Sequence, residues 1–177
     1  DMKKKDIILS GVGGQGILSI ATVIGWAALD QNLHLKQAEV HGMSQRGGDV
    51  QSNLRISTER IWSDLIPKGE CDIILSLEPM EALRYLPWLS KGGWIVTNST
   101  PFVNIPNYPP MEEITAELKK VGNIITLDCD QIAKQTGSPR SANMVLLGAS
   151  AAIMEILDPE KLREGITNVF SRKGEKV

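Results

Sequence analysis

The first candidate for chemistry is a glycine-rich loop near the start of the chain. Residues 11–16 read Gly-Val-Gly-Gly-Gln-Gly and match the pattern G-x-G-x-x-G. The loop follows an apolar run expected to form a buried strand, residues 6–10, and precedes a helical pattern that starts at Ile17, which is the context the pattern requires. Glycines let a backbone approach a ligand closely, and free N–H groups at a helix start attract anions. The predicted cofactor-binding residues of this loop are Gly11, Gly13, Gly14, Gln15 and Gly16.

A second polar loop that contains glycines covers residues 39–48. It offers the imidazole of His41, hydroxyl and amide groups, and the guanidinium of Arg46, which suits a phosphate or a carboxylate. If a parallel strand precedes it, this loop reaches the same carboxyl edge of the sheet as the first, where open α/β sheets bind ligands. The predicted binding residues here are Ser44, Gln45, Arg46, Gly47 and Gly48.

Other interpretations of the glycine loop remain open. It could be a tight turn from strand to helix with no ligand, in a binding or interaction module that keeps the fold without catalysis. It could also hold a nicotinamide or flavin dinucleotide in a stand-alone oxidoreductase. That site needs an acid at the end of the second strand, about 20 residues further on, to hold the ribose. Glu39 is the candidate, and it comes late in the chain for this purpose.

Several kinds of catalytic and metal site are missing from the sequence. Cys71 and Cys129 stand alone, and with the two histidines they form no recognised zinc or iron–sulfur ligand set. The sequence has no Gly-Asp-Gly motif of thiamine diphosphate enzymes, no Walker lysine after Gly16 and no nucleophile elbow. We therefore predict no metal site and assign no catalytic residue. Such a chain suits a subunit that positions a ligand for chemistry on another polypeptide.

The composition predicts one globular domain over residues 1–177. Hydrophobic residues make up 42% and charged residues 23%, which argues against disorder. The 19 Lys and Arg are outnumbered by 21 Asp and Glu, so the basic excess of nucleic-acid-binding proteins is missing. No stretch approaches the roughly 20 apolar residues of a membrane span, no signal peptide precedes the first strand, and no disulfide framework is expected. We expect a cytoplasmic protein that binds neither nucleic acid nor membranes.

Strand and helix patterns alternate along the chain. The expected strands are 6–10, 35–40, 49–57, 71–77, 94–98 and 123–127, and the expected helices are 17–32, 79–86, 111–121, 129–135, 141–157 and 159–170. Because most of the strands are apolar, they predict a largely parallel sheet covered by helices on both faces. The expected fold is a three-layer α/β/α arrangement with a glycine-rich loop after its first strand.

The two loops together carry a family resemblance. GVGGQG followed by EVHGMSQRGG resembles the gamma-type subunit or domain of the 2-oxoacid:ferredoxin oxidoreductases, and within that family the small beta subunit of indolepyruvate ferredoxin oxidoreductases. The resemblance covers nearly the whole chain, including CDIILSLEPMEALRYLPWL from Cys71 and SANMVLLGA from Ser141. Some relatives carry lysines in the second loop where this chain has Ser44 and Gln45, which leaves Arg46 as the only full positive charge there.

The resemblance implies a function that this chain does not perform alone. It implies the small subunit of an enzyme that oxidatively decarboxylates a 2-oxoacid, indolepyruvate or another arylpyruvate, to an acyl-coenzyme A. Electrons would pass to ferredoxin, and thiamine diphosphate and the iron–sulfur clusters would lie on a large partner subunit. The gamma-type subunit would help to close the active site and handle coenzyme A, with both glycine-containing loops near the coenzyme's phosphates.

Overall fold

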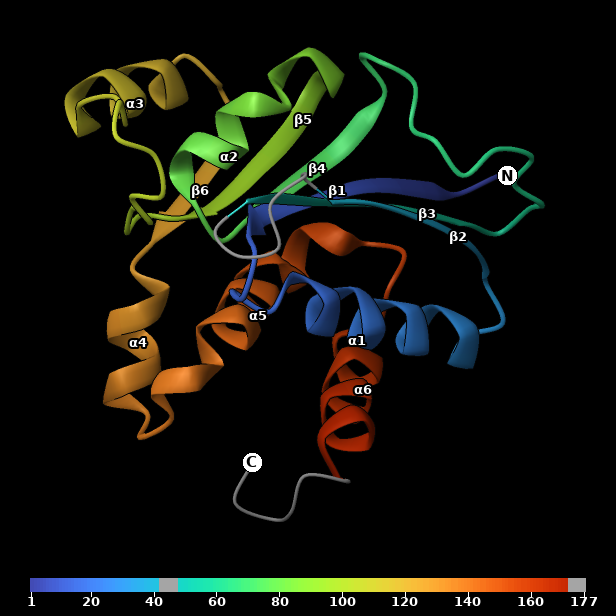
Figure 1. Cartoon of the computed structure of the whole chain (residues 1–177). Helices are drawn as coiled ribbons and strands as arrows, with labels where there is room; N and C mark the ends of the chain where they lie inside the picture. Colours follow the sequence, from blue (N-terminus) through green and yellow to red (C-terminus); the bar gives the residue numbers. More distant parts are fainter. Residues whose placement is uncertain (42–47, 172–177) are drawn as a thin grey trace.

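A six-stranded mixed sheet forms the centre of the molecule (Figure 1). The computed structural model describes residues 1–41 and 48–171. The strands stand in the order β2-β3-β1-β4-β5-β6. They are β1 (Lys4–Val12), β2 (His34–His41), β3 (Asp49–Ser57), β4 (Cys71–Ser76), β5 (Leu89–Asn98) and β6 (Ile124–Leu127).

Five of these six strands point the same way. β1 pairs in parallel with β4, β4 with β5, and β5 with β6, whereas β3 lies antiparallel to both β1 and β2. The mostly parallel sheet expected from the sequence is confirmed. Because β2 and β1 both run antiparallel to β3, they are parallel to each other, and the carboxyl ends of all five co-directional strands lie at one edge. We call this side of the sheet the carboxyl edge.

Helices cover both faces of the sheet (Figure 1). On one face lie α1 (Ile17–Asp30), α5 (Ala142–Met154) and α6 (Pro159–Phe170), and on the other lie α2 (Pro79–Arg84) and α3 (Met111–Lys119). The remaining helix, α4 (Cys129–Gln135), packs beside α5, and short 3-10 helices occupy Leu86–Trp88 and Pro139–Ser141. This is the expected α/β fold, with helices flanking the sheet.

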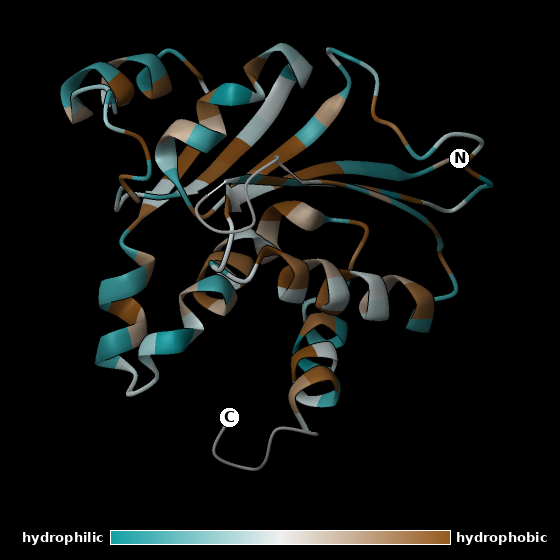
Figure 2. Cartoon of the chain, in the orientation of Figure 1, coloured by the Kyte–Doolittle hydropathy of each residue, from teal (hydrophilic) through white to brown (hydrophobic). Residues whose placement is uncertain are grey.

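The apolar runs of the central strands are buried from two sides. In β1, Ile7, Ile8 and Leu9 are all fully buried. Ile7 and Leu9 pack toward α1, α5 and α6, whereas Ile8 joins the cluster under α2 and α3. Successive side chains of a strand point to opposite faces, so a consecutive apolar run requires cover on both. Figure 2 shows these hydrophobic strands between helices whose colours alternate between hydrophobic and hydrophilic.

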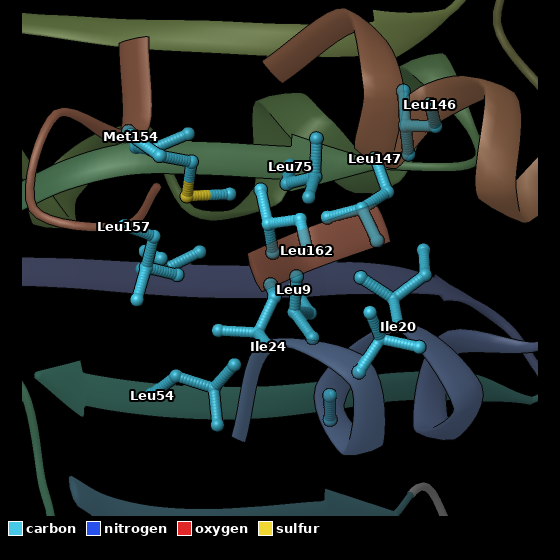
Figure 3. Packing of buried hydrophobic residues seen from close by; sticks show 14 of the residues in the cluster. Leu9, Ile20, Ile24, Leu54, Leu75, Leu146, Leu147, Met154, Leu157 and Leu162 are labelled. Carbon is cyan, nitrogen blue, oxygen red and sulfur yellow. The ribbon is translucent and has the colours of Figure 1, made fainter. Parts of the chain in front are cut away.

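The larger core cluster joins the glycine-loop helix to the C-terminal helix. Figure 3 shows Leu9 of β1, Ile24 of α1 and Leu162 of α6 lying together in this cluster. Close packing of α6 on α1 depends on Gly165, because an added Cβ would lie 3.1 Å from the Trp26 ring and 3.2 Å from the Val23 carbonyl oxygen. The middle of α1 is therefore packed closely against α6.

Several element boundaries differ from the sequence-based expectation. The helix expected over 141–157 ends at Met154, because Glu155 takes a positive φ of 54°. The strand expected at 94–98 begins earlier, at Leu89, and passes through a glycine pair that had been expected to precede it. Within the described residues, no helix is long and apolar enough to cross a membrane.

Candidate functional site

The glycine loop lies at the carboxyl edge, where the chain connections diverge. From β1 the chain passes through α1 toward β2 on one side of the sheet, whereas from β4 it passes through α2 to β5 on the other side and the opposite face. The carboxyl ends of β1 and β4 therefore flank a topological switch point. Open α/β sheets bind ligands in the crevice at such a point.

Two glycines of the loop have a backbone conformation that other residues adopt only with strain. Gly14 has a φ of 94° and Gly16 a φ of 89°. Gly16 is also crowded, because an added Cβ would lie 2.5 Å from Nδ2 of Asn143. Gly11 has a different role, since a Cβ there would lie 2.9 Å from Oε1 of Gln15. The glycine pattern thus reflects turn geometry and close packing at specific positions.

The second polar loop ends beside the glycine loop. The main-chain N–H of Gly13 donates to the carbonyl oxygen of Gly48 over 2.8 Å, and Val12 is the strand partner of Asp49. The structure thus places the end of the second loop at the same edge as the first. The other residues predicted in this loop, Ser44, Gln45, Arg46 and Gly47, lie outside the described residues.

The side chain of Gln15 is bonded to main-chain groups at both polar atoms. Its Oε1 accepts from the N–H of Val12 at 2.7 Å, and its Nε2 donates to the carbonyl oxygen of Leu77 at 3.3 Å. That same carbonyl accepts from Nδ2 of Asn98, also at 3.3 Å, and Asn98 donates in turn to Asp130. A single carbonyl therefore connects the loop after β1, the residue after β4 and the last residue of β5.

A cavity of about 660 Å³ opens on the side of the glycine loop that faces α5 and α6. Besides Gly14, Gln15 and Gly16, its polar lining consists of Ser19, Gly137, Ser138, Arg140, Ser141 and Asn143. Its apolar lining consists of Pro139, Met144, Ile166 and Phe170. No carboxylate is among the described residues that line it. The cavity therefore offers hydroxyl, amide and guanidinium groups opposite an apolar wall, a combination that suits an anionic ligand with an apolar portion.

Arg140 supplies the positive charge of this cavity. The side chain is exposed, and within residues 1–41 and 48–171 no hydrogen bond or ion pair engages its guanidinium. Sequence reasoning missed Arg140, because residues 137–141 resemble an ordinary break before a helix. Residues 137–141 lie opposite the glycine loop because α5 packs against α1. This packing places Nδ2 of Asn143 3.3 Å from the Gly16 carbonyl oxygen.

A buried acid lies next to this edge. Glu78 follows β4, is fully buried and caps α2 through the main-chain N–H groups of Met80 and Glu81. The Tyr108 hydroxyl donates to its Oε2 at 2.7 Å, and the Phe102 N–H donates to the same oxygen at 3.3 Å. Burial raises the pKa of Glu78, although these hydrogen bonds oppose the increase. The carboxyl group fastens the proline-rich segment 100–110 to the carboxyl edge.

The remaining candidates for chemistry are less reactive. Burial raises the pKa of the Cys71 and Cys129 thiols to about 12, so neither is a thiolate nucleophile at neutral pH. In the part of the chain that the structure describes, no group of three or more His, Cys, Asp or Glu side chains could hold a metal ion.

The geometry argues against a dinucleotide site of the Rossmann type. Glu39, the candidate ribose acid, lies on β2 and is the strand partner of Ser52 on β3. Since β3 separates β2 from β1, the acid is not on the strand next to the glycine loop. The Rossmann arrangement, in which the first two parallel strands are neighbours, is therefore not formed here, because the antiparallel β3 lies between them.

Comparison with known proteins gives consistent matches. The family model for pyruvate ferredoxin/flavodoxin oxidoreductase matches residues 6–177. Indolepyruvate oxidoreductase subunit IorB of Pyrococcus horikoshii is 40% identical over 156 residues, which cover 84% of this chain and 77% of that protein. The subunit of the same name from Methanothermobacter thermautotrophicus is 39% identical over 154 residues, or 83% of this chain and 78% of its own length.

Two solved structures share the fold. The gamma subunit of a keto/oxoacid ferredoxin oxidoreductase from Geobacter sulfurreducens has a TM-score of 0.65 and 26% identity, covering 93% of this chain and 85% of that one. A 2-oxoglutarate:ferredoxin oxidoreductase from Magnetococcus marinus, with 2-oxoglutarate, coenzyme A and succinyl-CoA bound, has a TM-score of 0.75 and 24% identity. It covers 99% of this chain, which spans only 28% of that longer chain.

The buried acid gives a testable pH dependence. Since the pKa of Glu78 is raised above 4.5, the folded chain binds more protons than the unfolded chain between pH 4.5 and the folded pKa. The free energy of unfolding of the wild type should therefore fall, relative to that of Glu78→Gln, as the pH rises through this window. Urea unfolding at a series of pH values measures it, with exposed Glu112→Gln as the control. A pH-independent difference between wild type and Glu78→Gln would contradict the assignment.

Proposed function

This chain belongs to the pyruvate ferredoxin/flavodoxin oxidoreductase family and is a small subunit of a 2-oxoacid:ferredoxin oxidoreductase. We propose that its complex oxidises indolepyruvate or another arylpyruvate. Relatives named as indolepyruvate oxidoreductase subunits, at about 40% identity over most of the chain, support this choice of substrate. The stand-alone nicotinamide or flavin oxidoreductase is not supported, because the matched proteins are oxidoreductase subunits. The family match over residues 6–177 also supports a single domain.

In this proposal the complex divides its tasks between two subunits. A large partner subunit carries thiamine diphosphate, which supplies the decarboxylation chemistry, and iron–sulfur clusters, which pass electrons to ferredoxin. The present sequence has neither the thiamine motif nor a set of cysteines for a cluster, which fits a partner that has both. Reduced, buried Cys71 and Cys129 suit the cytoplasm as the place of action.

The task proposed for this subunit is to hold coenzyme A, the acyl acceptor. The observation that carries it is the cavity beside the glycine loop, with a free guanidinium, an apolar wall and no carboxylate among its described lining residues. Coenzyme A carries phosphates and a long pantetheine arm that is partly apolar and has amide groups, so its chemistry matches that lining. The presence of coenzyme A in the related Magnetococcus marinus structure is consistent with the choice.

The binding groups can be named from the geometry. Within the described residues, the main-chain N–H groups of Gly14 and Gly16 donate to no other protein group, and both residues line the cavity. Together with Arg140 they would receive phosphate oxygens, as amides at helix starts commonly do. Gly11 and Gly13 shape the loop. Binding by Gly48, and by Ser44, Gln45, Arg46 and Gly47, which lie outside the described residues, stays a sequence-based prediction.

The proposed division of tasks predicts activity only in the complex. The isolated chain should show no turnover with indolepyruvate, coenzyme A and ferredoxin, because it lacks the groups that carry out decarboxylation. Adding a large subunit with thiamine diphosphate and iron–sulfur clusters should give indolepyruvate-dependent reduction of ferredoxin, followed spectrophotometrically. Turnover by the isolated chain with a nicotinamide cofactor would overturn the proposal.

The proposed role of Arg140 predicts a selective defect. In the complex, Arg140→Ala should raise the KM for coenzyme A about 5- to 20-fold, because a charge-assisted contact to phosphate is lost. The KM for the 2-oxoacid should not change. The control is Lys134→Ala, which removes an exposed positive charge on α4 outside the cavity lining. Equal coenzyme A kinetics in the wild type and Arg140→Ala would remove Arg140 from the site.

A further inference from the structure

The carbonyl oxygen of Leu77, at the carboxyl edge, accepts hydrogen bonds from two side chains. It accepts from Nε2 of Gln15 and from Nδ2 of Asn98, each at 3.3 Å. The main chain of Leu77 is also held in place, because the Leu77 N–H donates to the carbonyl oxygen of Ser10 at 3.0 Å. Leu77 is only 2% exposed, so water does not replace these partners. The glycine loop is thus tied to the end of β4 through one side chain.

The site that Gln15 occupies matches a carboxamide. The Val12 N–H requires an acceptor, which Oε1 supplies at 2.7 Å, and the Leu77 carbonyl requires a donor, which Nε2 supplies. A neutral carboxamide offers both in one planar group. The absence of a side chain at Gly11 makes the fit possible, since a Cβ there would lie 2.9 Å from Oε1. The main chain of Gln15 closes the same turn, with its N–H donating to the Val12 carbonyl at 3.1 Å.

The residues on either side of Gln15 both line the cavity, and within the described residues their main-chain N–H groups donate to no other protein group. Gly14 and Gly16 both have positive φ, and glycine has more conformational freedom than any other residue. Without a constraint, the direction of their N–H groups would fluctuate, and ordering them would reduce the affinity for a ligand. The constraints present are the Gln15 side chain on one side and Asn143, whose Nδ2 donates to the Gly16 carbonyl at 3.3 Å, on the other.

We infer that Gln15 is a positioning residue, which orients the Gly14 and Gly16 amides toward the phosphates of coenzyme A through its bonds to Val12 and Leu77. Neither polar atom of its side chain needs to touch the coenzyme, because both are bonded to main-chain groups. The inference rests on the proposed binding of coenzyme A in this cavity and adds how the loop is made ready for it. It differs from the sequence-based prediction of Gln15 as a direct binding residue.

Two substitutions in the assembled complex test this role. Gln15→Met keeps the length of the side chain but removes both hydrogen bonds, and should raise the KM for coenzyme A about three- to tenfold with little change in kcat or in the KM for the 2-oxoacid. Gln15→Glu keeps the acceptor for Val12 but sets a carboxylate against the Leu77 carbonyl. The control is Gln135→Met, at an exposed glutamine of α4 outside the cavity lining.

The pH dependence of Gln15→Glu separates positioning from general stability. A protonated carboxyl regains an O–H donor for the Leu77 carbonyl, and burial raises its pKa above the ordinary value of about 4.3. At each pH, the KM of a variant for coenzyme A is divided by the KM of the wild type. For Gln15→Glu this ratio should fall as the pH is lowered from about 8 to about 5.5. For Gln15→Met it should stay constant. The comparison of Gln15→Glu with the wild type remains informative even if Gln15→Met does not fold.

The outcomes distinguish this inference from the proposed function. If the wild-type complex shows a saturable dependence on coenzyme A and both Gln15 variants keep its KM, losing only thermal stability, then Gln15 is merely structural and the inference fails alone. If the KM of Gln15→Glu for coenzyme A does not fall on acidification, the inference also fails, because a donor to the Leu77 carbonyl then does not determine coenzyme A binding. If the wild-type complex does not depend on coenzyme A at all, the proposed function fails and the inference falls with it.

Discussion

Some main-chain groups at the carboxyl edge of the sheet, such as the Leu77 carbonyl, are buried away from water and need a hydrogen-bond partner from inside the protein. The Leu77 carbonyl meets this requirement with two side-chain amides, from Gln15 and Asn98. An unpaired buried carbonyl would cost about 1–3 kcal/mol, which is a large share of the stability of a domain of this size. The need to satisfy one buried group therefore fixes how the glycine loop sits relative to β4 and β5, and so which way its free amides point.

The same edge is reinforced on its far side by Glu78. A fully buried carboxyl group without a cation is costly, and it is tolerated here because Tyr108, Phe102 and two N–H groups of α2 donate to it. These bonds tie the proline-rich segment 100–110 to the residue that follows Leu77. The two networks are adjacent in the chain, and together they make the carboxyl edge a rigid platform between the two helical layers.

Much of the fold follows from patterns within single segments. The apolar run at 71–77 is β4 almost residue for residue. Of the glycine loop expected over residues 11–16, residues 13–16 lie between strand and helix, whereas Gly11 and Val12 belong to β1. The antiparallel β3 could not be predicted, because alternation along a strand indicates burial on one face and not the direction of its neighbours. Arg140 and the Glu78–Tyr108 contact were likewise hidden, since each joins segments that meet only through tertiary packing. The sequence thus indicated the glycine loop on one side of the cavity but not the residues of the opposite wall.

We propose that the glycine loop and the segment before α5 form the two walls of one coenzyme A cavity. Hydrogen–deuterium exchange on the assembled complex, with and without coenzyme A, tests it most directly. We expect slower exchange of the main-chain amides in both segments, residues 13–19 and 140–144, when coenzyme A is added. Protection confined to other parts of the chain, with these two segments unchanged, would contradict it.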